Sequence, residues 1–508
     1  MTTTSTAATV HDMTSHLPEG KPKGEGEEKG PSQSTVLLQM GQEGYRYVHD
    51  GVHVYAVEID GPAIARPLKG TGGLRQALTR RYAVKTGKAP SQGSLTDAVS
   101  TLEALADVTD PVELSLRVGA DADSPHATWL DLGRADGQSV CIDPTGWALA
   151  SPPDGRGPLW RRTRRVGTMP MPERHADGWE AGLSLLRGVL PVSDAAWPMT
   201  VAWLLSALRP DIPRPIAYFT GEQGTGKSTA GRLLLRVIDG IGADLCAPPR
   251  TEDDLAVATA AGWVLAMDNL SSVAPWLSDA LCRTVTGDSI MKRELYSNDD
   301  VTLLIFRRPV LLTGIDIGAV RGDLAERMLP LQLEVIPDTE RRAERDLWGE
   351  YRRSHPHILG GLLTLAAQVW ERLPEASQQL KSRPRMADWA ELLWALDDVT
   401  GWDTLGKYTG AQDELIDDVL SSDRVGSTLL AWATSSVTPD QWEGEVAQLL
   451  EILPAPLGDQ HWPRTPGALS GRLTRAAPSL RKRGVDVARK RVKGRRVVTI
   501  TVDRTATR

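Results

Sequence analysis

The chain has 508 residues, with 58 Lys and Arg against 65 Asp and Glu, a formal net charge of −7. This length exceeds one ordinary domain, so three or four folded units are expected. Three widely separated cysteines argue against a disulfide framework or a zinc site and fit a reducing compartment, by default the cytoplasm.

In chain order, the first segment is polar and rich in Gly, Glu and Lys, and residues 1–35 are predicted to be disordered. An α+β domain is expected over 36–185, with strands around the Asp50-Gly51 turn, helices near 72–84 and 94–106, and short strands such as 112–118 and 128–132. The sequence indicates no function for this domain. The longest apolar run, 195–208, is too short for a membrane span, and the N-terminus does not resemble a secretory signal.

A nucleotide-binding core is expected over 186–338. The apolar segment 216–219 is typical of a strand buried on both faces, and the segment after Lys227 has the apolar spacing of a helix. Between them lies a glycine-rich loop with the P-loop spacing, whose backbone amides would surround phosphates while Lys227 reaches the β and γ oxygens and Ser228 completes a Mg²⁺ shell. The alternative is a chance match in a loop. The candidate ATP-binding residues are Gly221, Gln223, Gly224, Thr225, Gly226, Lys227, Ser228 and Thr229.

A second buried strand, 263–268, ends in Asp268, where a P-loop enzyme places the acid that orders the metal's water ligands. Ser228 and Asp268 are therefore the candidate metal residues, and a turn residue at the strand end is the alternative for Asp268. Asn269 stands where many such enzymes carry a Glu that activates water. Since an amide cannot accept that proton, either another acid such as Asp288 acts as the base, or Asn269 orients water and turnover is slow.

A third apolar strand, 309–314, follows at the distance expected for a strand that senses the γ-phosphate, with Thr313 as its polar end. Downstream, Arg327 precedes the strand 329–335. An Arg at this place in ring ATPases reaches the neighbouring subunit's nucleotide, and Arg327 is the candidate finger. The alternative is a surface ion pair with Asp323 or Glu326.

The remainder divides into a helical region, 339–437, and a basic unit, 438–508. From Arg464 to the end there are fourteen Lys and Arg against two Asp. Three helices, a basic turn and a strand over 496–502 favour a winged helix, and the charge favours phosphate binding. A solvated face, or docking on the acidic body of the same protein, is the alternative. The candidate DNA contacts here are Arg481, Lys482, Arg483, Arg489, Lys490, Arg491, Arg495 and Arg496.

The order of these parts resembles superfamily 3 helicases, a branch of the AAA+ ATPases. More narrowly, it is similar to ATPases of phage, plasmids and integrative elements in high-GC bacteria, which are related to the helicase half of phage primase-helicases. The resemblance covers 190–400 and the end of the chain from Trp462. It departs from the family at Asn269, where a second acid is usual, and at Thr313, where an Asn is usual. The stretches that carry it are 221–229, 265–271, 278–283, 286–287, 292–296, 323–327 and 385–390.

The resemblance implies an α/β P-loop AAA+ core with a central parallel sheet, assembled as a homo-hexamer around single-stranded DNA. The segment 290–306 matches the hairpin that such rings place in the central pore. Lys292 and Arg293 would meet phosphates, and Tyr296 would stack on a base. A plain surface hairpin is the alternative.

Three functions are therefore weighed. The first is an ATP- and Mg²⁺-dependent ring DNA helicase or translocase in replication of a mobile element, acting on single- or double-stranded DNA with other replication proteins. The second is an ATP-gated DNA-binding initiator or assembly switch with slow hydrolysis. A P-loop kinase or metabolic enzyme fits least, because no acceptor-substrate motif accompanies the loop. The absence of zinc-binding cysteines argues against a fused primase.

Overall fold

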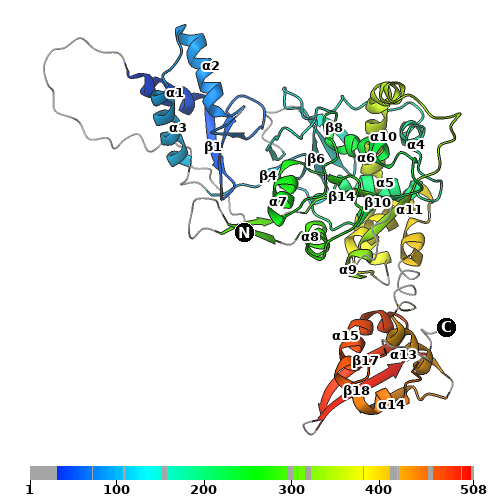
Figure 1. Ribbon diagram of the computed structural model, residues 1–508. Coiled ribbons are helices and arrows are strands. Elements are labelled where there is room, and N and C mark those ends of the chain that lie inside the picture. The colour runs from blue at the N-terminus through cyan, green and yellow to red at the C-terminus, as the bar shows by residue number, and fades with distance from the viewer. Residues whose placement is uncertain are drawn as a thin grey trace.

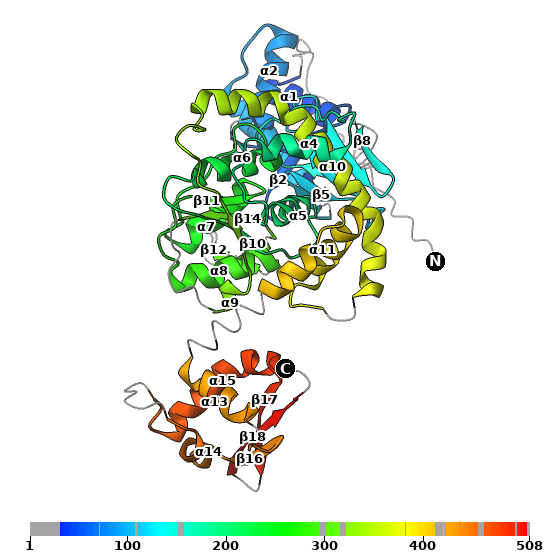
Figure 2. The same ribbon diagram turned by 90° about the vertical axis from the view of Figure 1, so that its right-hand side faces the viewer.

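The computed structural model in Figures 1 and 2 arranges the chain in a central body flanked by an N-terminal and a C-terminal group of elements. The structure describes residues 31–70, 72–106, 110–150, 157–287, 289–293, 301–305, 307–314, 322–380, 383–411, 420, 423–435, 437–455, 462–492 and 495–504.

The N-terminal group packs three helices against a small antiparallel sheet in the order β1-β2-β3. Leu37, Leu78 and Leu102 are fully buried between the helices and the sheet. Residues 33–35, within the segment predicted to be disordered, form the first turn of α1, which is capped by the Ser32 side chain. The elements are α1 (Gln33–Gly44), β1 (Tyr45–His49), β2 (Val54–Glu58), β3 (Arg66–Pro67), α2 (Leu74–Thr86) and α3 (Gln92–Ala106).

A second antiparallel sheet, in the order β5-β6-β7-β8, follows in the sequence but does not pack against the N-terminal helices. Leu130, Val140 and Ile142 on this sheet belong to the hydrophobic core of the central body. The stretch 36–185 therefore contributes to more than one core. Its later elements are β4 (Leu114–Ser115), β5 (Val118–Ala120), β6 (Thr128–Asp131), β7 (Ser139–Asp143), β8 (Gly146–Ala150) and β9 (Leu159–Trp160).

Arg117 ties this sheet to the central body. Its guanidinium is fully buried and donates to the carbonyl oxygens of Asp131 (2.5 Å), Asp239 (2.6 Å) and Gly167. The Asp239 carboxylate lies 3.7 Å from the Arg117 Nε. A buried charge is tolerated only when such partners surround it, so these contacts fix the two parts together.

The central body is a parallel four-stranded sheet in the order β11-β14-β10-β15. Alternate residues of its strands face two different cores, as expected for a parallel sheet covered on both faces. Helices α5 and α6 cover one face, and α7 and α8 cover the other. The strands are β10 (Ile216–Thr220), β11 (Leu265–Met267), β14 (Val310–Thr313) and β15 (Met328–Gln332), and the helices are α4 (Trp179–Arg187), α5 (Trp197–Ala207), α6 (Lys227–Asp239), α7 (Glu252–Ala261), α8 (Pro275–Thr286) and α9 (Gly322–Ala325).

Two long helices complete the central body. Helix α10 (Glu344–Gln379) packs along α4 and α11 (Ala387–Thr400), and it is followed by a further helical stretch, 404–411. The expected mixed α/β class with a parallel sheet is confirmed. In the part of the chain that the structure describes, no helix combines the length and apolar character that crossing a membrane requires.

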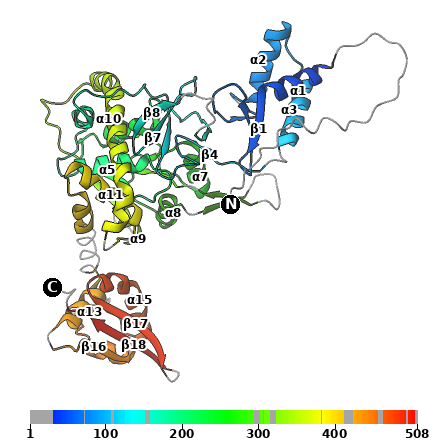
Figure 3. The ribbon, with the colours of Figure 1, turned by 180° about the vertical axis from the view of Figure 1, so that it is seen from behind.

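The C-terminal group has a hydrophobic core of its own and lies below α9 and α11 in Figure 3. An antiparallel sheet, β16-β18-β17, packs against α13, α14 and α15 through residues such as Leu429, Leu473 and Ile500. The predicted single strand at 496–502 is part of β18, and β16 and β17 were not predicted, although Val485 and Val487 alternate with polar residues as strand residues do. The elements are α13 (Arg424–Thr434), β16 (Gln441–Glu445), α14 (Val446–Ile452), α15 (Pro466–Lys482), β17 (Val485–Val492) and β18 (Arg495–Val502).

Candidate nucleotide site

The glycine-rich loop joins the carboxyl end of β10 to the first residue of α6, which is where parallel α/β sheets bind ligands. Gly224 and Gly226 have φ angles of +89° and +76°, a left-handed backbone that side chains disfavour. With these turns the loop leads into the N-terminus of α6. The free amide groups and the dipole at this helix end attract anions. A hollow of about 240 Å³ follows the loop and is lined by Gln223, Gly224, Gly226, Lys227, Ser228 and Thr229.

Two further loop residues have roles in shaping the loop. Thr225 is buried, and its hydroxyl donates to the Glu222 carbonyl over 3.0 Å. The Lys227 ammonium folds back and donates to the carbonyl oxygens of Gly221 (2.8 Å) and Glu222 (2.7 Å). Both carbonyls are neutral acceptors, so phosphate oxygens would compete well for this cation.

Ser228 and Asp268 meet beside the loop, as the sequence analysis expected of a metal pair. The Ser228 hydroxyl donates to Asp268 Oδ1 over 2.7 Å. Asp268 follows the last residue of β11, and Ser228 is in the first turn of α6. A hydroxyl and a carboxylate are hard oxygen donors of the kind that Mg²⁺ binds directly or through water, so the pair fits that ion.

Thr313 joins the same cluster from the end of β14. Its hydroxyl donates to Asp268 Oδ1 and accepts the backbone N–H of Asn269 over 3.1 Å. Because β14 lies between β10 and β11, Thr313 stands between the phosphate loop and the carboxylate strand. The three polar side chains therefore form one connected cluster at the carboxyl edge of the sheet.

Asn269 is the only described non-glycine residue with a positive φ, at +57°. Asparagine tolerates this left-handed conformation better than most residues. From the sequence, Asn269 is notable only as an amide in the place of a catalytic acid, and its backbone conformation was not predicted. Asp288, the other acid considered there, lies outside the described residues.

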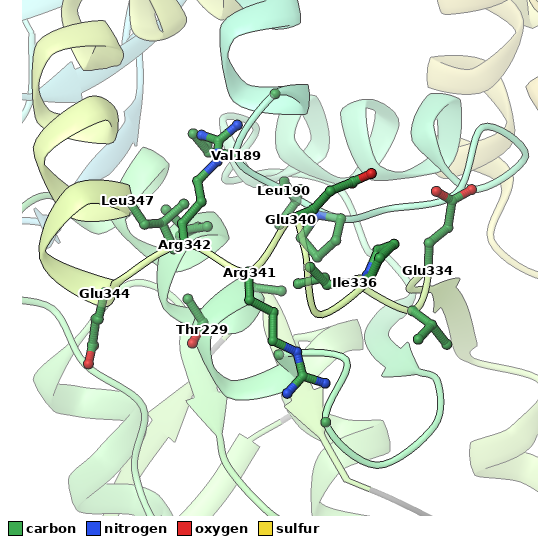
Figure 4. Close-up of a pocket in the computed structure, with 18 of the residues that line it drawn as sticks. Val189, Leu190, Thr229, Glu334, Ile336, Glu340, Arg341, Arg342, Glu344 and Leu347 are labelled. Atoms are coloured by element: carbon green, nitrogen blue, oxygen red, sulfur yellow. The ribbon is translucent and has the colours of Figure 1, made fainter.

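A larger cavity of about 890 Å³ opens next to the loop (Figure 4). It is lined by Val189 and Leu190 after α4 and by residues of the segment 334–344 between β15 and α10. The sequence does not predict this cavity, because the segments that line it carry no motif and are distant along the chain. Its volume and partly apolar lining suit a small ligand.

Arg327 lies at the opposite edge of the sheet from the loop. Its carbonyl accepts the N–H of Ile216, the first residue of β10, whereas the phosphate loop follows the last. The guanidinium is mostly buried and pairs with Asp323 at 2.5 Å. Burial alone would raise the pKa of Asp323. Hydrogen bonding to Arg385 and the charges of Arg327 and Arg385 outweigh it, so this pKa is lower than usual. Arg327 thus makes the ion pair that was the alternative to a finger.

The candidate DNA contacts are divided between two places. Lys292 and Arg293 are in β12 (Ser289–Arg293), which pairs antiparallel with β13 (Val301–Ile305) in a hairpin outside the central sheet. Tyr296 lies outside the described residues.

The other candidate contacts lie on α15 and the long hairpin of β17 and β18. Arg481 pairs with Asp486 at 2.6 Å, Arg489 donates to the Ser470 carbonyl, and Lys482 lies 3.9 Å from Glu326 of the central body. Lys490 is exposed on β17. Arg483 follows α15, and the others are strand residues: Arg491, Arg495 and Arg496.

A parallel sheet with a glycine-rich loop between a buried strand and a helix, and with a Ser–Asp pair beside that loop, defines the P-loop class of α/β proteins. Residues 184–418 match the family described as "Actinomycete integrative conjugative element replication protein", and residues 425–508 match the "AICE RepA C-terminal domain". The chain belongs to this family of mobile-element replication proteins. The resemblance to proteins of integrative elements is thereby confirmed.

Several solved structures are similar to the chain at low identity. "SCCmec type IV Cch - active helicase" aligns at 12% identity over 90% of this chain and 93% of that chain, with a TM-score of 0.40. The A form apo structure of the NrS-1 C terminal region aligns at 13% identity over 93% of this chain and 99% of that chain, with a TM-score of 0.41. None of the curated proteins matches this sequence.

Proposed function

We propose that the protein is an ATP-dependent ring DNA helicase or translocase that acts in replication of its mobile element. The observation that carries the proposal is the contact of Ser228 with Asp268 beside the loop, because it assembles phosphate-binding and metal-binding groups at one place. The family supplies the replication setting.

In this function the triphosphate lies on the loop, with its phosphates held by backbone amides and by Lys227. A Mg²⁺ ion at Ser228 and Asp268 would neutralise charge on the β- and γ-phosphates. Thr313 holds the Asp268 carboxylate by its hydrogen bond and would lie near the γ-phosphate. Asn269 orients the attacking water, since its amide cannot remove a proton.

A ring is proposed because Arg327 cannot serve the site of its own chain. It lies at the far edge of the sheet, so only a neighbouring copy could bring it to a nucleotide. The phosphates of the nucleotide on the neighbouring copy would then replace Asp323 as the partner of Arg327. An arginine supplied in this way stabilises charge that develops during phosphoryl transfer.

DNA binding is proposed for the hairpin of β12 and β13 and for the C-terminal group. Three helices with a three-stranded antiparallel sheet and a long terminal hairpin are the elements of a winged helix, which supports that assignment. Exposed Arg475 and Lys490, with the neighbouring cations, supply charge for phosphate contacts that are independent of DNA sequence.

The alternative is an ATP-gated initiator or assembly switch with slow hydrolysis. Asn269 favours it, because the position after Asp268 has no carboxylate and its backbone geometry is of a kind that asparagine satisfies. In that case DNA retention by the C-terminal group, rather than movement, is the output of ATP binding.

The deciding experiment is ATPase activity of the full chain with and without single-stranded DNA, beside a Lys227→Ala control. Stimulation of about tenfold that the control abolishes supports the motor. Tight ATP binding with slow turnover that DNA does not stimulate contradicts the motor and supports the switch. An unchanged rate in Lys227→Ala would contradict both.

A further inference from the structure

The segment between β15 and α10 brings an arginine to the rim of the phosphate loop. The Arg341 Nη2 atom lies 3.8 Å from the position that a Cβ on Gly224 would occupy. Figure 4 shows this side chain extending from the cavity wall toward the loop. Both Arg341 and Gly224 line the 890 Å³ cavity, so the cation faces the space beside the loop rather than the outer surface alone.

The partner that holds Arg341 in this structure is weak. Its Nε lies 3.2 Å from Asp338, and the two side chains are 57% and 90% exposed. Exposed pairs of this kind contribute little, because water screens them and their side chains lose rotational freedom. A ligand with two or three negative charges would displace Asp338 readily, and the planar guanidinium suits paired phosphate oxygens.

The neighbouring arginine has a different environment, although it lines the same cavity. Arg342 Nη1 pairs with Glu350 of α10 at 2.6 Å, and its side chain points away from the loop in Figure 4. The two residues share charge, size and position in the sequence. They differ in which way the side chain is directed, so Arg342 is a matched control for Arg341.

The rest of the cavity suits the other end of a nucleotide. Ile336 Cδ1 lies 3.9 Å from the Cβ position of Gly226, and Val189, Leu190 and Leu347 add apolar surface. This surface fits a base, and the loop fits the phosphates. A nucleotide spanning both would pass its phosphate chain along the rim where Arg341 stands.

We propose that Arg341 is a nucleotide-binding residue that acts in its own chain and contacts the phosphate chain of a nucleoside triphosphate on the loop. This inference rests on the proposed function, because it assumes that the loop binds such a nucleotide. Arg341 would be a second cation at the phosphates, in addition to Lys227, and it comes from outside the loop motif. Because Arg341 lies three residues before α10 begins, nucleotide binding would also engage the segment that leads into that helix.

The test is fluorescence titration of the full chain with mant-ATP, mant-ADP and mant-AMP in Mg²⁺, using wild type, Arg341→Gln and Arg342→Gln. Loss of a charge-assisted contact predicts that Arg341→Gln weakens mant-ATP binding by about tenfold or more, and mant-AMP binding less. Arg342→Gln should stay within about twofold to threefold of wild type. Thermal melting of each variant confirms that the fold is kept.

Equal binding of mant-ATP by Arg341→Gln and wild type would overturn the inference while leaving the proposed function intact. A loss of equal size for ATP and AMP would also overturn it, because that result indicates a structural effect and not a phosphate contact. If wild type fails to bind any of the three nucleotides, the proposed function fails and the inference fails with it.

Discussion

Ser228 donates a hydrogen bond of 2.7 Å to Asp268, which lies forty positions further along the chain. This contact joins the first turn of α6 to the end of β11, and Thr313 binds the same carboxylate oxygen from β14. Asp268 is therefore held from two sides before any ion binds. Such preorganisation fixes where a metal and its water ligands would be placed.

Replacing Asp268 with Asn should therefore impair metal use more than nucleotide binding. Loss of a group that orients a metal's ligands typically reduces metal affinity or activity by about 10- to 100-fold. We expect ATPase activity to fall by that factor and the Mg²⁺ concentration for half-maximal activity to rise. Measuring ATPase rate against Mg²⁺ concentration checks this, with nucleotide binding in EDTA as the control. An unchanged Mg²⁺ midpoint would remove Asp268 from the metal site.

Asn269 gives a prediction about stability, because its φ of +57° lies in the left-handed region, which Gly and Asn tolerate better than other residues. Asn269→Ala should lower the free energy of unfolding by about 1 kcal/mol, whereas Asn269→Gly should keep it near the wild-type value. Urea denaturation of the two variants measures the difference. If Ala and Gly are equally stable, the left-handed backbone at this position is not under strain.

A mixing experiment tests whether Arg327 acts on a neighbouring subunit. Lys227→Ala lacks a working loop and Arg327→Ala lacks the proposed finger, so each variant alone should have little ATPase activity. In a mixed ring, an intact loop of one subunit can meet an intact Arg327 of the next. Activity should then exceed the sum of the separate preparations, measured after co-incubation at several ratios. Purely additive activity would indicate that Arg327 only forms its ion pair with Asp323.

His355 on α10 predicts a pH dependence of stability. Burial and, to a lesser extent, the charge of Arg117 lower the pKa of His355 to about 4, from an ordinary value of 6.5. Between these pH values the unfolded chain binds the proton and the folded chain does not, so lowering the pH destabilises the fold. The shift corresponds to a loss of about 3 kcal/mol in the free energy of unfolding. This loss is absent above pH 6.5 and complete below pH 4.

The measurement is urea denaturation at intervals from pH 7 to pH 4, for wild type and His355→Leu. Other groups titrate in both proteins, so the difference between the two curves isolates this residue. We expect wild type to lose stability relative to the variant as the pH falls. A constant difference across the range would show that His355 takes up its proton normally in the folded state.

The sequence alone determined the features that are local or directly periodic. The loop from Gly221 to Thr229 is contiguous, and the strand before it and the helix after it are set by neighbouring residues, so the P-loop core could be predicted. The strand that ends before Asp268 and the hairpin of β12 and β13 followed from runs of apolar residues and turn signals. The family resemblance rested on the same contiguous motifs.

Only the tertiary structure decided which distant segments meet. The placement of β14 between β10 and β11 brings Thr313 to Asp268, and the sheet order is not a property of any one strand. The positive φ of Asn269 occurs where the chain leaves β11 and the Asn269 N–H donates to the Thr313 hydroxyl, and residue type alone does not reveal it. Arg341 carries no motif and becomes a candidate ligand only because the chain after β15 returns to the loop. Local signals fix elements, whereas packing and hydrogen bonding between elements fix the site.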